Sequence, residues 1–332
     1  MRTIRNTPLL MSGRVPAPYT RREFAKGLAA ASFTAAAWRC GAQPSASAYE
    51  QELDARQREI DMILPNDFAA YWQRGLDLPA DELNAMKRSL PVLARLEDAF
   101  EKVLREAKET VVNDVDHPAI WYVYNMGLIV KTATTMFSID LHHRRAEEFA
   151  PLLDFALITH NHNDHYTERF KYAMDRVQHK PVVNNFFDNY GIKDRRFGGY
   201  TRAKSKVFQY GDVKIITGLC DHNPYLIDYT TPFEVQIGKY TLYHSGDCFS
   251  HVKLHVSRQP DIWIFHPYCG MDTAKACVAA IHPKLAVIAH LQELGHSIGV
   301  NRWTYRDGLL DKQRIEAAGF VAKMPLWGER LA

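Results

Sequence analysis

The segment His160-Asn161-His162-Asn163-Asp164-His165 is the feature that most limits what this chain can fold into. It follows the apolar run 155–158 after a single threonine, and such a run predicts a short buried strand. Three imidazoles and a carboxylate therefore leave the end of a strand within six residues. Groups of this kind at this density predict a metal-binding loop, rather than a polar loop whose histidines cluster without function.

The spacing within this loop divides the ligands between two positions. In an extended segment alternate side chains share a side, so His160 and His162 can hold one ion together. Asp164 and His165 are adjacent past a turn and point toward a second position. Neutral imidazoles with a carboxylate suit zinc, with manganese or iron as alternatives, and the lack of a cysteine argues against a purely structural site. We therefore predict two divalent metal ions.

The pattern HxHxDH after an apolar strand resembles the signature of the metallo-β-lactamase superfamily. That resemblance implies further ligands downstream, each at a strand end. His222 in "GLCDHN", Asp247 in "YHSGDC" and His290 in "AVIAHL" occur in the implied order, and "MPLWGERLA" resembles the family's closing strand. The resemblance covers roughly residues 119 to 331.

The resemblance also implies how the ligands divide. One metal takes His160, His162 and His222, the other takes Asp164, His165 and His290, and Asp247 lies between them. His244 is an alternative to His222, because it is close in sequence. Asp140, at the end of "MFSID", matches a family aspartate that lies near the site without being a ligand, although a simple strand-end cap explains it equally well.

Strands with helices between them predict an α+β fold, two sheets sandwiched between helices, and the resemblance implies the four-layer αββα sandwich of the metallo-β-lactamase fold. Hairpins are expected to turn at Gly211-Asp212 and Gly238-Lys239. We expect helices over 166–178, 272–281 and 302–318, the last ending at Gly319. This domain would span 117–332. Residues 49–116 show helical periodicity interrupted by Pro91, which predicts an N-terminal helical extension that packs on the domain or covers its site.

The N-terminus predicts export. "TRREFAKGLAAASFTAAAW" resembles a twin-arginine signal, its apolar run is too short to span a bilayer, and "SASA" at 45–48 supplies small residues for cleavage. We expect a signal peptide over 1–48, use of the twin-arginine export machinery, and a periplasmic or secreted mature chain. The alternative is a basic N-terminus of a cytoplasmic protein.

Removing this segment changes the charge of the chain. Residues 1–48 contain seven Lys/Arg and one acid, so 34 of the 41 basic and 37 of the 38 acidic residues remain, a net charge of −3. Nothing in the composition points to nucleic acid, and no stable membrane insertion is expected. An oxidising compartment would permit disulfides among Cys220, Cys248, Cys269 and Cys277, but free buried thiols are equally consistent with the sequence.

The predicted chemistry is hydrolysis of a small-molecule substrate. Two divalent ions lower the pKa of a shared water, so that hydroxide is available near neutral pH, and Asp164 is the candidate catalytic side chain that orients it or moves its proton. His266 and Tyr268 in "FHPYCG" and His296 in "LGHS" are candidate substrate contacts, with packed or structural loop residues as the alternative.

The bond that is cleaved is left open. The branch that the chain resembles most contains ascorbate-6-phosphate lactonase-like proteins and N-acyl-phosphatidylethanolamine phospholipase D-like phosphodiesterases. Few Arg or Lys flank the ligands, which favours a neutral lactone or ester over a phosphodiester, unless the basic segment 193–206 supplies a phosphate site. A non-catalytic metal-binding protein is the third alternative, and the complete ligand set argues against it. A β-lactamase role is not expected, because the long helical extension is not typical of those enzymes.

Overall fold

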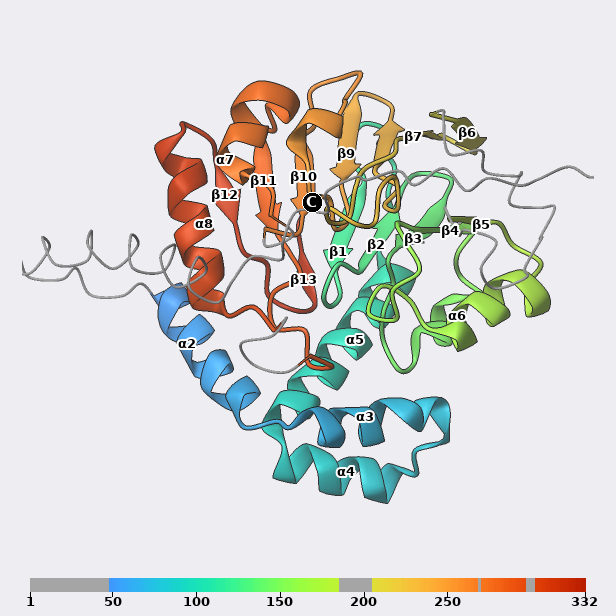
Figure 1. The fold of residues 1–332 in the computed structure, drawn as a ribbon. Helices are drawn as coiled ribbons and strands as arrows, with labels where there is room; N and C mark the ends of the chain where they lie inside the picture. The colour runs from blue at the N-terminus through green and yellow to red at the C-terminus, as the bar shows by residue number, and fades with distance from the viewer. Residues whose placement is uncertain (1–47, 185–204, 268–269, 297–301) are drawn as a thin grey trace, which may run out of the picture. The chain divides into compact units, whose positions relative to one another are not determined.

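The computed structural model describes residues 48–184, 205–267, 270–296 and 302–332 (Figure 1). Its first sheet has the strand order β13-β1-β2-β3-β4-β5. The strands are β1 (Ala119–Tyr122), β2 (Leu128–Lys131), β3 (Met136–Ile139), β4 (Phe155–Ile158), β5 (Val182–Asn184) and β13 (Glu329–Arg330). β4 lies parallel to both β3 and β5, whereas β1 pairs antiparallel with β2 and β13.

The second sheet has the order β12-β11-β10-β9-β8-β7-β6. Its strands are β6 (Val207–Tyr210), β7 (Val213–Thr217), β8 (Phe233–Ile237), β9 (Tyr240–His244), β10 (Ile262–Phe265), β11 (Leu285–Ile288) and β12 (Ala322–Lys323). β9 to β12 are parallel, and the two predicted hairpins, β6–β7 and β8–β9, are present. Because parallel strands end at the same edge of a sheet, the segments that follow β9, β10 and β11 meet there.

Helices cover the outer faces of both sheets, which confirms the predicted four-layer sandwich. α8 (Tyr305–Ala317) packs on β11 and β12, with α7 (Thr273–Ala276) beside it, and α5 (Pro91–Glu109) contacts β2. A continuous apolar core fills the space between the sheets, where the ring of Phe155 in β4 stacks on Tyr210 in β6 with centroids 4.5 Å apart. Shorter helical segments are α6 (Glu168–Tyr172), the π-helical turns Ala173–Val177 and Cys277–Ile281, and the 3-10 turns Gly75–Asp77, Ala146–Phe149 and His251–Lys253.

The predicted helical extension is present and consists of α2 (Ala48–Asp61), α3 (Pro65–Gln73), α4 (Ala80–Ser89) and α5. Pro91 separates α4 from α5, because proline is favoured in the first turn of a helix and breaks a helix interior. α5 buries one face, including Leu93, Leu96 and Phe100, whereas α4 buries no residue. No helix among the described residues is long and apolar enough to cross a bilayer.

Two helix starts differ from the prediction. The last helix begins at Tyr305 rather than Arg302, because Thr304 caps it: the Thr304 hydroxyl accepts a hydrogen bond from Asp307 N, and the Asp307 carboxylate accepts one from Thr304 N. The helix expected from residue 166 begins at Glu168, with Thr167 as its cap. The predicted signal peptide lies outside the described residues except for Ala48, and the boundary at 116/117 stays a prediction, since residues 49–332 form one compact unit.

Candidate metal centre

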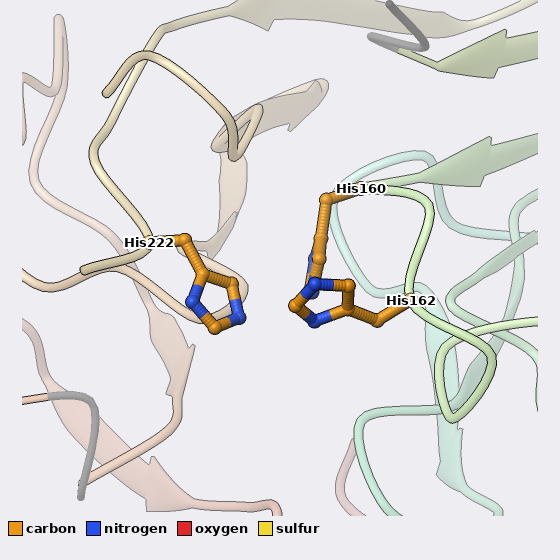
Figure 2. Close-up of side chains that lie close together, drawn as sticks. All are labelled: His160, His162 and His222. Atoms are coloured by element: carbon orange, nitrogen blue, oxygen red, sulfur yellow. The ribbon is translucent and has the colours of Figure 1, made fainter. Parts of the chain in front are cut away.

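His160, His162 and His222 face one another across a small gap (Figure 2). Their ring centroids are 4.5 Å apart for His160–His162 and for His162–His222, and 4.9 Å apart for His160–His222. One nitrogen from each ring lies within 4.8 Å of the others, close enough to surround one ion. His244, the alternative to His222, instead places its Nε2 3.0 Å from the Met126 carbonyl, and it belongs to no ligand group among the described residues.

A second group consists of Asp164, His165 and His290. The Asp164 Oδ2 atom lies 2.9 Å from His290 Nε2 and 3.8 Å from His165 Nε2. All three side chains are buried. Within the loop 160–165, His160 and His162 at its start belong to the three-histidine group and Asp164 and His165 at its end belong to this one, as the spacing predicts.

Asp247 faces both groups. Its Oδ2 atom lies 3.4 Å from His222 Nε2 and 3.6 Å from His290 Nε2, and its Oδ1 atom lies 3.4 Å from His165 Nε2. The structure therefore brings together all seven residues predicted as ligands. That they hold two ions stays a prediction.

The fold explains why residues so distant in sequence meet. The loop 160–165 follows β4, and Asp247 and His290 follow the parallel strands β9 and β11 at one edge of the second sheet. The buried strands fix these starting points, so the ligands project from short segments rather than from long loops. His290 has a left-handed backbone with φ of 56°, a conformation that residues other than glycine adopt mainly under such constraints.

The unpaired atoms of the cluster fit a metal. The Nε2 atoms of His160, His165 and His222 and the Oδ1 atom of Asp247 are buried and have no hydrogen-bond partner among the described residues. Leaving buried polar atoms unpaired costs about 1–3 kcal/mol each. Several such atoms aimed at one space are explained when a cation fills it, and imidazole nitrogens with carboxylate oxygens suit zinc, manganese or iron.

The electrostatics of the cluster agree with this interpretation. Burial and the neighbouring His222 and His165 lower the pKa of His162 to about 4, so its ring is neutral at pH 7 and able to ligate. Burial by itself would raise the pKa of Asp247, but the charges of His165 and His290 hold it well below the usual range. For His165, burial by itself would lower the pKa. The carboxylates of Asp247, Asp164 and Asp140 outweigh burial and raise the pKa of His165 well above its ordinary value. A divalent ion would replace the proton that these carboxylates attract.

Asp140 binds the ring nitrogen of His165 that points away from the cluster. Its Oδ2 atom lies 2.8 Å from His165 Nδ1 and accepts a hydrogen bond from the Thr159 hydroxyl, while its Oδ1 accepts one from Thr159 N. A carboxylate on the far nitrogen fixes the tautomer and orientation of a ligating histidine. Asp140 is thus both a strand-end cap and a partner of a candidate ligand, so the two alternatives that the sequence left open combine in one side chain.

Asn125, which was not among the predicted site residues, joins the two loops of the second group. Its Nδ2 donates to the Asp164 carbonyl at 2.7 Å, and its carbonyl accepts from His290 N at 2.9 Å. Asn125 has φ of 56° in the turn between β1 and β2. The only sequence signal at Asn125 is the turn pattern Asn-Met-Gly, and this pattern predicts a turn without indicating a functional site.

The three predicted substrate contacts have different surroundings. His266 lies with its Nδ1 3.5 Å from Asp247 Oδ2 and stacks on His290, with ring centroids 3.9 Å apart, so it borders the ligands directly. His296 and His266 both line a cavity that also contains His162, His222 and Asp247. The Nδ1 atom of His296 lies 2.6 Å from the buried carboxylate of Glu293, another residue that the sequence did not indicate. Tyr268 lies outside the described residues. A role in substrate binding stays a prediction for all three.

A disulfide between Cys220 and Cys248 joins two ligand loops. Cys220 precedes His222 by two residues, and Cys248 follows Asp247 directly. Cys277 is buried with a free thiol, and Cys269 lies outside the described residues. The pairing, which the sequence left open, therefore ties His222 to Asp247 covalently.

Comparisons with known proteins find no matching family model and no matching curated protein. Among solved structures the chain is similar to CmlA, a diiron β-hydroxylase from Streptomyces venezuelae, with 16% identity, a TM-score of 0.45 and coverage of 65% of this chain, but the match spans only about half of CmlA, 54%. It is also similar to Igni18, a metallo hydrolase from the archaeon Ignicoccus hospitalis, with 16% identity, a TM-score of 0.49 and coverage of 64% of this chain and 97% of that one. A third is the metallo-β-lactamase fold protein YhfI from Bacillus subtilis, with 13% identity, a TM-score of 0.45 and coverage of 64% and 99%. Likenesses this distant concern the fold, and we take no activity from them.

Proposed function

We propose that this protein is a metal-dependent hydrolase with two divalent ions, zinc by donor type with manganese or iron as alternatives, that acts on a lactone or ester. The observation that carries the proposal is the position of Asp247, whose Oδ2 atom faces His222 of the first ligand group and His290 of the second, while its Oδ1 atom faces His165 of the second. A carboxylate shared between two ligand groups suits two ions better than one. When bound, such ions supply a hydroxide nucleophile near neutral pH and polarise a carbonyl oxygen.

The chain's own groups position the reacting atoms. Asn125 and His290 hold Asp164, whose carboxylate is then oriented to accept or return a proton at the nucleophile. His296 borders the same cavity and is oriented by Glu293, so it can donate a proton to the oxygen that leaves. Trp303 also lines this cavity.

The cavity favours an uncharged substrate. Its volume is about 370 Å³, and none of the described residues that line it is a lysine or arginine. A phosphodiester carries a negative charge that such side chains normally hold. A phosphodiesterase would have to use Arg144 and Arg169, which line a neighbouring cavity, but these pair with Glu97 and Asp77. The basic segment 193–206 lies largely outside the described residues.

The test combines metal content with turnover. We expect about two ions per wild-type chain by mass spectrometry, fewer in His160→Ala, and the wild-type value in His117→Ala, which removes an exposed histidine away from the site. Loaded wild-type protein should hydrolyse γ-butyrolactone or methyl butyrate and leave bis-p-nitrophenyl phosphate intact. Turnover of the phosphodiester alone would favour a phosphodiesterase over a lactonase or esterase. Folded protein that takes up no zinc, manganese or iron would overturn the metal assignment.

We further propose that the chain is exported by the twin-arginine machinery and acts in the periplasm or outside the cell. The disulfide supports this, because such bonds persist mainly in oxidising compartments. Mass spectrometry of the mature N-terminus in an exporting host would test it. Cleavage near residue 48 that is abolished by Arg21→Lys with Arg22→Lys is the expected result, and an uncleaved chain retained in the cytoplasm would contradict it.

A further inference from the structure

A second cavity adjoins the metal centre, and the helical extension forms one side of it. This α3 cavity has a volume of about 290 Å³ and shares Asn163, Asp164 and His296 with the cavity that contains the candidate ligands. Its opposite side consists of Phe68, Ala69 and Trp72 from α3. A molecule whose reacting bond lies at Asp164 could therefore extend into a space that the extension shapes.

The side of the cavity formed by α3 is held firmly in place. Trp72 stacks on His142, with ring centroids 4.2 Å apart, and His142 follows β3 close to the site. The preceding residue, Tyr71, donates a hydrogen bond to Glu97, which also accepts one from Arg144. All of these side chains except the half-buried Trp72 are buried. The cavity is thus a built feature rather than a gap beside a loose helix.

The loop that carries Glu293 and His296 is tied to the same extension. The guanidinium of Arg302 is buried and donates to the carbonyls of Ile60 and Ile63, at 3.3 and 3.2 Å. It also donates to the carbonyls of Glu293 and Leu294, at 3.1 and 2.6 Å. One side chain therefore fixes the end of α2 and the segment that leads into α3 relative to the loop on the other side of the cavity.

The lining of the α3 cavity selects against anions. Its α3 side is apolar except for Gln73 at the end of the helix, and its other side carries the carboxylates of Asp164 and Glu293. None of the described lining residues is a lysine or arginine. A carboxylate or phosphate placed there would meet the carboxylates of Asp164 and Glu293, and the imidazole of His296, which also lines the cavity, is already paired with Glu293. An aromatic ring or alkyl chain would instead bury its surface against Phe68 and Trp72.

We propose that α3 is the specificity element of the enzyme, and that the α3 cavity binds an uncharged apolar arm of the substrate, an aryl or medium-length alkyl group. This inference builds on the proposed hydrolase activity. The substrate class becomes esters or lactones with one apolar substituent, and Ala69 and Trp72 set how large that substituent can be.

The test is a substrate series with a cavity-filling variant. For the methyl esters of acetate, butyrate, hexanoate and 4-phenylbutyrate, followed by pH-stat, we expect kcat/KM to rise about fourfold per buried methylene until the cavity is filled. Monomethyl glutarate, which ends in a carboxylate, should be turned over poorly. The corresponding alcohol series, from methyl to hexyl and benzyl acetate, covers an arm on the leaving-group side.

Ala69→Trp fills the cavity, and Ala70→Trp is its matched control, because Ala70 is exposed on the same helix and does not line the cavity. Ala69→Trp should lower kcat/KM at least tenfold for the longest substrates and change the acetate value less than twofold, with Ala69→Leu intermediate and Ala70→Trp unchanged. A flat wild-type series, or equal losses for short and long esters in Ala69→Trp, would overturn the proposal.

A binding measurement separates this inference from the hydrolase proposal. Ligand-observed NMR with 4-phenylbutanol, which has no bond to hydrolyse, should show saturable binding to wild type and Ala70→Trp and loss of binding in Ala69→Trp. Binding without any turnover would leave the apolar cavity standing while the proposed hydrolysis fails. Turnover of esters without this binding would refute the assignment of the cavity.

Discussion

At the scale of single residues, the orientation of the ligands depends on side chains that cannot themselves reach an ion at the centre of the cluster. Asp140 is the clearest case, since it holds His165 Nδ1 at 2.8 Å and leaves Nε2 aimed into the cluster. The Asp140→Asn change keeps the size of the side chain but removes its charge. The ring of His165 can then adopt the other tautomer, which turns its lone pair away from the site.

We expect Asp140→Asn to weaken metal affinity by about 10- to 100-fold, as the loss of such partners does elsewhere. Competition titration with a chromophoric chelator would measure it. Asp154→Asn is the control, because Asp154 caps Met136 N at the other end of the same strand, away from the ligands. Equal affinities for Asp140→Asn and wild type would show that His165 needs no such partner.

Asn125 allows a second test at this scale. Asn125→Ala removes the amide that holds the Asp164 carbonyl, and it leaves the seven predicted ligands in place. We expect kcat to fall by at least tenfold while about two ions remain bound, because Asp164 loses its orientation. Unchanged kcat with intact metal content would mean that His290 alone orients Asp164.

The sequence indicated the residues that the structure brings together as candidate ligands, but not the side chains that hold them in place. The four candidate ligands in the loop 160–165 can be recognised from their spacing, because a metal ion needs several donor atoms close together. Asp247 and His290 were inferred only through the family resemblance. Asn125 and Glu293 act through a backbone carbonyl and a neighbouring imidazole, and these contacts form only when segments far apart in sequence meet, so no local pattern marks them.

At the scale of elements, strands and hairpins followed from local pattern, and helix ends did not. Gly211 and Gly238, with φ of 56° and 53°, occupy the turns that the sequence predicted, because glycine adopts this backbone without strain. The predicted start of α8 was three residues too early. Arg302 and Trp303 fit the helical pattern of the residues that follow them, but Thr304 caps the N-terminus, so the helix begins only at Tyr305. Arg302 is instead used to bind four carbonyls.

The disulfide between the loops after β7 and β9 gives a prediction for these elements. Reduction, or the double change Cys220→Ala with Cys248→Ala, should lower the free energy of unfolding by about 2–4 kcal/mol, given the 28-residue separation. His222 and Asp247 would also lose their covalent link, so metal should be released at lower chelator concentration. Urea unfolding and chelator titration, each with and without reductant, measure the two effects.

The double alanine variant is the internal control of that experiment. It should behave like reduced wild-type protein and show no response to reductant. Cys277→Ala should keep the response, because its thiol is free. A wild-type chain whose stability and metal retention ignore the reductant would contradict the prediction.

At the scale of the whole molecule, the helical extension is joined to the sandwich by a buried charged network. Burial would raise the pKa of Glu97, but His143 and the hydrogen bonds from Arg144 and Tyr71 lower it from its ordinary 4.5 to about 2. Because the folded pKa is the lower one, the stabilisation from ionised Glu97 is fully present above about pH 4.5 and is lost as the pH falls toward 2. Its magnitude is on the order of 3 kcal/mol.

Glu97→Gln should therefore be destabilised relative to wild type at neutral pH, and the difference should shrink between about pH 4.5 and 2. Urea unfolding of both proteins across this range would measure it. Glu101→Gln is the control, because Arg145 pairs with both Glu97 and the half-exposed Glu101, and Glu101 lies outside the buried network. A difference that stays constant with pH would show that Glu97 acts through packing rather than charge.

The buried guanidinium of Arg302 has a consequence for how this protein can change over time. Because it binds the segment before α3 and the loop of Glu293 together, the extension cannot be deleted or exchanged as an independent module without disturbing the loop that carries Glu293 and His296. Substitutions within α3 that leave this attachment intact change the shape of the α3 cavity, while every candidate ligand stays in place. If the α3 cavity binds substrate as proposed, new substrate preferences are most accessible, to evolution or to an engineer, through the cavity-lining positions of this one short helix.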